Sequence, residues 1–307
     1  MNRDEFLENP DVVGFVEWLS KALPTLPVHL KIARSRFVPH AIDCNVNGIE
    51  AVQAKYCWGG NWEAVKSRLR MLRTRLRLAV RSGSEARIHE ACHAILAWGD
   101  VDGASVFLQE LLEKERLGKY LKDCRRLLAL DRDQRLSELT KDTIQRFDSG
   151  MTKIHALFDK TGSPIYDGRV GAASALLYRM YRCESKTAAH ESLNFAWGPG
   201  HGNQIRNPRL LGLGYNGSPQ LSTASGHLWA RRQIQLGWII RAVLERSKLF
   251  KTLPRIQDRC HAFEAGLFMM GYDLRSMIPD GFSIALPAKK KYGRRNHKTR
   301  TRRQALS

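Results

Sequence analysis

The sequence predicts a mainly α-helical protein with a small β appendage near its N-terminus. Of its 307 residues, 43% are apolar, which is enough to bury one large core or two lobes. Apolar residues recur at helical spacing through most of the chain, whereas strand-like patterns are short and few. We see no internal repeat that would indicate a solenoid.

The expected elements follow from this periodicity and from Gly, Pro and capping residues between the periodic stretches. Strands are expected at residues 27–32, 41–49 and 282–286. Helices are expected at 65–80, 85–98, 104–117, 119–130, 135–147, from Thr152, from Gly168, at 227–247 and at 256–270.

The net charge of +20 is unevenly distributed along the chain. Nine of the excess charges lie between residues 288 and 303, a stretch without a single acidic residue. We interpret residues 288–307 as a flexible basic tail that either improves solubility or binds phosphates. The other eleven charges belong to residues 1–287, so a polyanion is the expected class of partner.

The helix at residues 65–80 carries an apolar stripe and, one position further along, a basic stripe with nearly the same spacing. Such a basic face is either the solvated side of a bundle helix or a rail that binds phosphates. The apolar stripe is Val65, Leu69, Leu72, Leu76 and Val80, and the basic stripe is Lys66, Arg70, Arg73 and Arg77.

Cysteine, histidine and hydropathy patterns exclude several classes of protein. The six cysteines form no CxxC pair, and the ten histidines form no HExxH or other ligand spacing, so we expect reduced thiols, no metal and no cofactor. No run of eighteen apolar residues is present, and the N-terminus lacks the apolar core of a secretory signal. We therefore expect a cytoplasmic protein that does not bind membranes.

A long segment rich in Gly, Pro and Asn, residues 195–219, interrupts the helical pattern. It is longer than most connections between helices, and such loops usually either bind a ligand or are mobile. Trp197 and His201 are suited to stacking on bases, and Arg206 and Arg209 to holding phosphates. Trp229 and Trp238 are further candidates for stacking on or wedging between bases. The apolar run around Trp238 favours a core position for it.

Lys153 and Asp167 are separated by one short helix and one turn. Taken alone, Lys153 is typical of a surface lysine, and Asp167 is typical of an N-cap for the helix that starts at Gly168. An amine and a carboxylate at this separation are also the two groups that cutting a base from DNA requires. Glu264, in the helix at 256–270, is expected either to pair in the core or to face a cleft.

The segment resembles the helix-hairpin-helix DNA glycosylase superfamily, especially its 8-oxoguanine DNA glycosylase-like branch. The similarity lies in Thr152-Lys153-Ile154, Pro164-Ile165-Tyr166 and Asp167-Gly168-Arg169-Val170. The family's hairpin, PGVGTKVA, carries the lysine, but Ser149 and Met151 stand where that hairpin has glycines. The iron-sulfur loop of some members is absent. The resemblance implies a two-lobed helical domain over residues 1–287, with a degenerate helix-hairpin-helix and a cleft between the lobes.

The resemblance also implies an activity and roles for several residues. A nucleotide is flipped out of double-stranded DNA, and Asp167 stabilises the positive charge that develops on the sugar or orients a water. Lys153 attacks C1′ if the enzyme also has lyase activity. Arg169 joins the phosphate-binding residues, and Tyr166 lines the base pocket.

The expected function is therefore that of a monomeric DNA glycosylase acting in repair or anti-phage defence. The roomy Gly-rich loop favours a bulky phage-type base such as glucosylated hydroxymethylcytosine. Two other functions remain open. The charge alone also fits a noncatalytic nucleic-acid-binding protein, or a protein-interaction factor that reaches RNA through its tail.

Overall fold

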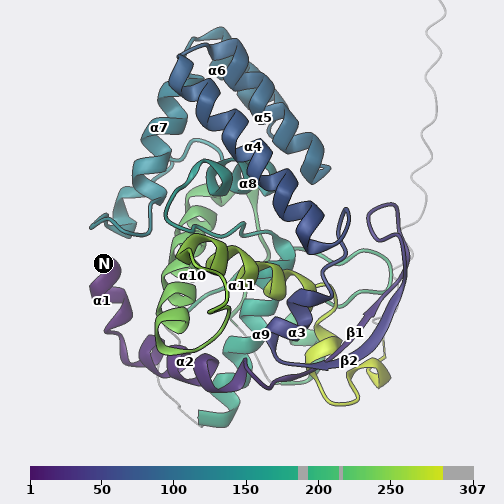
Figure 1. Cartoon of the computed structure of the whole chain (residues 1–307). Helices are drawn as coiled ribbons and strands as arrows, with labels where there is room; N and C mark the ends of the chain where they lie inside the picture. The colour runs from purple at the N-terminus through teal and green to yellow at the C-terminus, as the bar shows by residue number, and fades with distance from the viewer. Residues whose placement is uncertain (186–192, 214–216, 286–307) are drawn as a thin grey trace, which may run out of the picture.

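A computed structural model describes residues 1–185, 193–213 and 217–285, and it is mainly helical with one small sheet (Figure 1). The basic tail at 288–307 lies outside the described residues. In chain order the elements are α1 (Arg3–Leu7), α2 (Pro10–Ala22), β1 (Pro27–Ile32), β2 (Ile42–Asn47), α3 (Ile49–Ala54), α4 (Trp62–Ser82), α5 (Glu85–Gly99), α6 (Ser105–Glu113), α7 (Leu117–Leu128), α8 (Ser149–Phe158), α9 (Gly168–Ser185), α10 (Gly226–Arg246) and α11 (Ile256–Met270).

Helix α8 lies in the middle of the molecule. Helices α4, α5 and α7 pack around it, and α6 completes this group in the upper part of Figure 1. All residues of α8 from Gly150 to Phe158 are buried. Helices α2, α9, α10 and α11 lie below, so the chain between α8 and α9 joins the upper group to the lower one (Figure 1).

The β appendage is an antiparallel hairpin. Its register runs from Pro27 opposite Asn47 to Ile32 opposite Ile42, which confirms the first two expected strands. Residues 282–285, the described part of the third, form no strand. A 3-10 turn, Gly281–Ser283, occupies this place, and it follows Asp280 in the left-handed conformation (φ 51°), which reverses the chain and interrupts an extended path.

Most helix predictions are confirmed to within a few residues, and the 256–270 helix matches α11 at both ends. The helix expected at 135–147 is wrong, because only the 3-10 turn Leu136–Glu138 forms there. The Thr143 hydroxyl donates to the Glu138 carbonyl (2.6 Å), and the Thr140 amide donates to Thr143 Oγ1 (2.9 Å). These side chains occupy backbone groups that a continuous helix would use.

All six cysteines are free thiols, as the spacing indicates. Three are buried, namely Cys92, Cys124 and Cys260. Across the described ranges, no helix combines the length and the apolar character that crossing a bilayer requires.

Candidate active site

Lys153 is a buried lysine on α8. Asp148 caps this helix by accepting hydrogen bonds from the Gly150 and Met151 amides (both 2.9 Å). The Lys153 ammonium donates to the Ser149 carbonyl one turn earlier (2.7 Å), and only 8% of the residue is exposed. The interpretation of Lys153 as a surface lysine is therefore wrong.

The Lys153 side chain has room only because Gly99 ends the neighbouring helix α5. A Cβ atom on Gly99 would lie 2.6 Å from Lys153 Cδ and 2.7 Å from Cε, much closer than van der Waals contact allows. The position of the amine is therefore determined by two helices, α5 and α8.

Asp167 caps α9, as the sequence predicts. Its Oδ1 accepts hydrogen bonds from the amides of Arg169 (2.8 Å) and Val170 (3.0 Å). Its Oδ2 lies 3.4 Å from Arg169 Nη1, so the second carboxylate oxygen is engaged by a charge and by no backbone amide in the described structure. Asp167 is 7% exposed, which makes it a buried, ionisable cap.

The segment that follows Leu193 crosses the start of α9. Gly198 donates its amide to the Gly168 carbonyl (3.1 Å), and a Cβ on Gly168 would lie 2.7 Å from Gly198 Cα. Two glycines therefore allow the two backbones to touch beside Asp167.

The charges of Lys153 and Asp167 influence each other. Burial lowers the pKa of Lys153, which the carboxylate of Asp167 opposes and the nearby Arg169 reinforces. Burial also raises the pKa of Asp167, but Arg169 and Lys153 outweigh burial, so its pKa lies below its usual value. Asp167 is consequently an ionised carboxylate at neutral pH, next to an amine that loses its proton more readily than usual.

Glu264 is the third titratable group of the site. Burial, with the negative charge of Asp167, raises the pKa of Glu264 to about 8, so it is protonated at neutral pH. Its Oε2 lies 3.7 Å from Nδ1 of His261, one turn earlier on α11. Of the two alternatives expected from the sequence, the structure favours pairing in the core, where Asp167 and Lys153 influence the charge of Glu264.

Arg169 lies among three aromatic rings. Its guanidinium carbon is 4.5 Å from the Trp58 ring centre, 4.7 Å from that of Phe268 and 4.8 Å from that of Tyr272. Contacts of this kind hold a cation without neutralising it. These three aromatic residues were not predicted as site residues, because only the folded chain brings their segments together around Arg169.

Arg206 also lies close to Asp167, although it comes from the Gly-rich segment. It is 5% exposed, and it donates from Nε to the Tyr272 carbonyl (3.3 Å) and from Nη1 to that of Pro199 (3.2 Å). Burial lowers its pKa to about 10, and Arg169 adds to this effect. Arg206 therefore holds the Gly-rich segment in place and adds positive charge to the site. Its guanidinium bonds backbone carbonyls, so it is not free for the phosphate contact that was predicted.

The other predicted residues of this segment lie further out. His201 and Arg209 are exposed. Trp197 is half-buried, and its indole N–H donates to the Ser218 carbonyl (3.2 Å).

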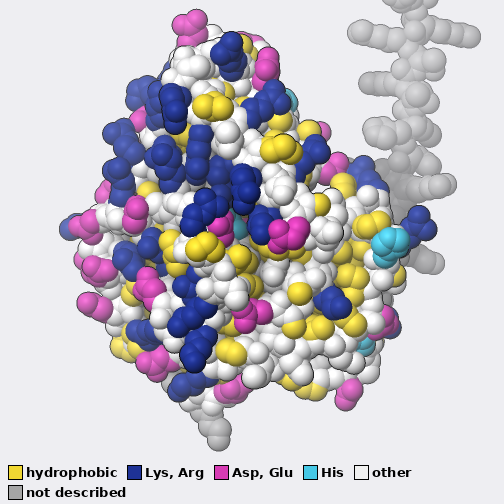
Figure 2. Space-filling view, in the orientation of Figure 1, with side chains coloured by type: hydrophobic (Ala, Val, Ile, Leu, Met, Phe, Trp, Pro, Cys, Tyr) yellow, Lys and Arg dark blue, Asp and Glu magenta, His cyan; other side chains and the backbone are white. Residues whose placement is uncertain are grey.

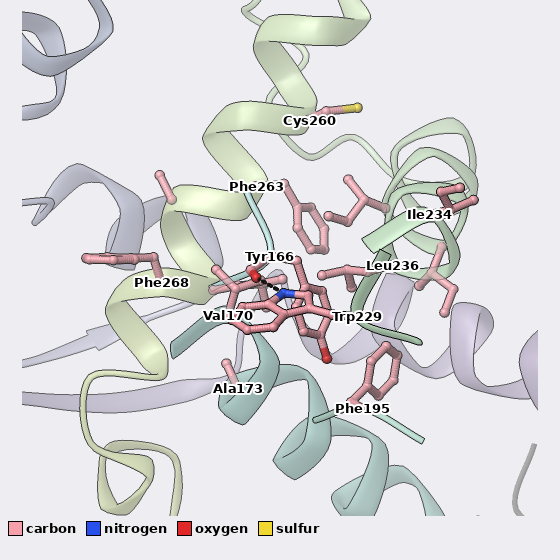
Figure 3. Close-up of a cluster of buried hydrophobic side chains, with 14 of the residues drawn as sticks. Tyr166, Val170, Ala173, Phe195, Trp229, Ile234, Leu236, Cys260, Phe263 and Phe268 are labelled. Carbon is pink, nitrogen blue, oxygen red and sulfur yellow. Dashed lines mark hydrogen bonds between the residues drawn. The ribbon is translucent and has the colours of Figure 1, made fainter. Parts of the chain in front are cut away.

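Tyr166 was predicted to line a base pocket, but the structure places it in the core (Figure 3). Its hydroxyl donates to the Ala196 carbonyl (3.1 Å) and accepts from the Ala196 amide (2.9 Å). Its own carbonyl accepts from the Trp229 indole (2.7 Å), as the dashed line in Figure 3 shows. Tyr166 and Trp229 thus fix the chain just before Asp167, and Trp238 is fully buried, so none of the three is free to stack on a base.

The basic stripe predicted on residues 65–80 is only partly available to a ligand. Arg73 donates to Nε2 of His261 (2.8 Å), and Arg77 donates to the Asp159 carbonyl, so both connect α4 to neighbouring segments. Lys66 pairs with Glu63 (2.8 Å), and Arg70 is exposed. The prediction that four free cations on α4 form a rail for phosphates is therefore wrong.

Comparison with models of known families, with curated proteins and with solved structures found no significant match. Within the described ranges, no three His, Cys, Asp or Glu side chains are grouped to hold a metal ion. The site itself offers an amine, an ionised carboxylate, a protonated carboxyl group and two guanidinium groups.

Proposed function

We propose that the protein is a DNA glycosylase that hydrolyses the N-glycosidic bond of a modified base. The observation that supports this proposal best is the burial of Lys153, Asp167 and Glu264 in one electrostatically coupled group. Perturbed titratable groups that act on one another are typical of active sites. In this proposal α4 to α8 form one lobe, the remaining helices form the other, and the group lies where α8, α9 and α11 meet.

The ionised carboxylate of Asp167 has the central role. As the bond to the base breaks, positive charge develops on C1′ of the sugar, and a buried carboxylate stabilises that charge more strongly than it would in water. Its Oδ1 accepts the hydrogen bonds of the helix cap, whereas Oδ2 has only the 3.4 Å contact with Arg169 and in this proposal faces the sugar or orients a water. The base first leaves the stack, because its glycosidic bond is not accessible inside a duplex.

Glu264 supplies a proton in this proposal. A departing base carries negative charge, and a carboxyl group that is still protonated near neutral pH can donate a proton to it. A pKa of about 8 meets this requirement, while the neighbouring Asp167 stays ionised. Two carboxyl groups with separated pKa values thus divide the acid role from the charge-stabilising role.

Lys153 adds a second chemical route. Its lowered pKa increases the fraction of free amine, which attacks C1′ as the base leaves and then loses a proton. Opening of the sugar ring gives an imine between C1′ and Nζ, and loss of the 3′-phosphate by β-elimination cuts the strand. Hydrolysis assisted by Asp167 releases the base without the imine. Loss of the lyase reaction should therefore leave base release by hydrolysis intact.

The test is release of bases from duplexes that carry oxidised, alkylated or glucosylated bases, followed by alkaline cleavage of the abasic sites. We expect release from at least one member of this panel, with bulky glucosylated hydroxymethylcytosine the leading candidate. Asp167→Asn keeps an oxygen that caps α9 but removes the charge, so release should fall by about a hundredfold or more while DNA affinity changes little.

Asp273→Asn is a matched control, because Asp273 is also a buried cap, paired with Arg275 (2.7 Å). It should release bases at close to the wild-type rate. Equal activity of wild type and Asp167→Asn would refute the role of Asp167. Duplex binding without release from any member of the panel would favour the second candidate function, a noncatalytic nucleic-acid-binding protein, which the many Lys and Arg side chains on one face already suggest (Figure 2).

A further inference from the structure

A groove outside the candidate active site runs between α7 and the segment that follows α8. Its volume is about 710 Å³, and Lys and Arg side chains gather over this side of the molecule (Figure 2). Six of its lining residues are basic and three are acidic. The basic ones are Lys119, Lys122, Arg125, Arg126, Arg132 and Lys160.

Two of the three acidic residues are already engaged. Asp123 pairs with Lys119 and Arg126 on its own helix (both 2.6 Å). Asp159 turns inward, where one carboxylate oxygen accepts from three successive backbone amides, Thr161 (2.6 Å), Gly162 (2.8 Å) and Ser163 (2.9 Å). With six basic and three acidic residues, the groove keeps a net positive charge, and Asp123 and Asp159 already have partners.

Three cations of the groove have no acidic partner. No carboxylate of the described ranges lies within ion-pair distance of Lys122, Arg132 or Lys160, which come from three separate segments. Like charges repel, so the fold brings them to one groove at a cost that an anionic ligand would offset.

The groove connects to the candidate active site through a line of basic side chains. Arg125 lies over the Phe158 ring (5.1 Å) at the end of α8, and Arg77 bonds the carbonyl of the next residue, Asp159. Arg73, one turn before Arg77, bonds His261, and His261 in turn lies beside Glu264. These contacts join the groove to the candidate active site through a chain of neighbouring side chains.

We propose that this groove binds the phosphodiester backbone of double-stranded DNA and that it, more than α4, holds the substrate duplex. The proposal rests on the proposed function for the identity of the polyanion. It assigns to α7 the role that the sequence assigned to the basic stripe of α4.

The experiment compares two double variants of the full chain that have equal net charge. Lys122→Glu/Lys160→Glu reverses two groove charges, and Lys21→Glu/Lys31→Glu reverses two exposed charges on α2 and β1. Binding to an unmodified duplex is measured by fluorescence anisotropy between 50 and 200 mM salt. Duplex RNA of the same sequence and polyglutamate serve as competitors, and base release is measured in parallel.

We expect the groove variant to bind the duplex about tenfold or more weakly, with a salt dependence reduced by about two phosphate contacts, and the control to bind nearly as wild type. Equal loss in both variants would overturn the proposal, because net charge would then account for binding. Polyglutamate or RNA that displaces the duplex as well as unlabelled DNA does would also overturn it. Groove-dependent binding without base release would contradict the proposed function alone, and base release that is insensitive to the groove would contradict the groove alone.

Discussion

Glu264→Gln should stabilise the fold increasingly as the pH rises. A carboxyl group whose pKa is raised in the folded state binds a proton more tightly there than in the unfolded chain, so the free energy of unfolding falls as the pH rises from the unfolded value to the folded one. For Glu264 these values are 4.5 and about 8. One pKa unit corresponds to about 1.4 kcal/mol, which gives a loss of about 2 kcal/mol at pH 6 and about 5 kcal/mol above pH 8.

Glutamine has nearly the same shape and cannot ionise, so the variant should not show this loss. Its free energy of unfolding, measured by urea denaturation at pH 5, 6.5 and 8, should rise relative to wild type at each step. The surface substitution Glu245→Gln is the control and should show no such trend. A gain for Glu264→Gln that does not grow with pH would refute the reasoning, whereas slower base release by this more stable variant would link the strained carboxyl group to function.

Two further predictions concern buried residues on or beside α8. Burial lowers the pKa of His155 to about 4, so the free energy of unfolding of wild type should fall by about 3 kcal/mol between pH 6.5 and pH 4. His155→Phe keeps a ring against Phe147 and cannot take up a proton, so urea denaturation at those two pH values should show a smaller loss. An equal loss in the variant would contradict this. Gly99→Ala should displace the Lys153 side chain; trapping of the imine with borohydride should then fall while base release persists, and equal trapping would mean that the amine does not need its place beside Gly99.

Local patterns in the sequence were enough to predict much of the fold. The hairpin and α11 follow from periodicity, and Asp167 follows from the rule that an aspartate before a helix caps it. The helix expected at 135–147 failed because threonine side chains compete for the backbone there, which periodicity does not register.

The candidate site was harder to predict than the fold. Lys153 and Asp167 lie within fifteen residues of each other, so sequence could pair them. Glu264 and the rings around Arg169 come from distant segments that only the folded chain brings together. Which basic residues stay free also depends on tertiary contacts, as Arg73 and Arg77 show by bonding to neighbouring segments.

The aromatic enclosure of Arg169 has a consequence for how the site responds to its surroundings. A guanidinium paired mainly with carboxylates loses its effect when those groups are protonated or when salt screens them. Aromatic rings are not protonated, and they carry no net charge for salt to screen. The positive potential that Arg169 creates at Asp167 should therefore hardly vary with pH or ionic strength. A change of buffer that releases the protein from DNA would then leave the field around the carboxylate almost as it was.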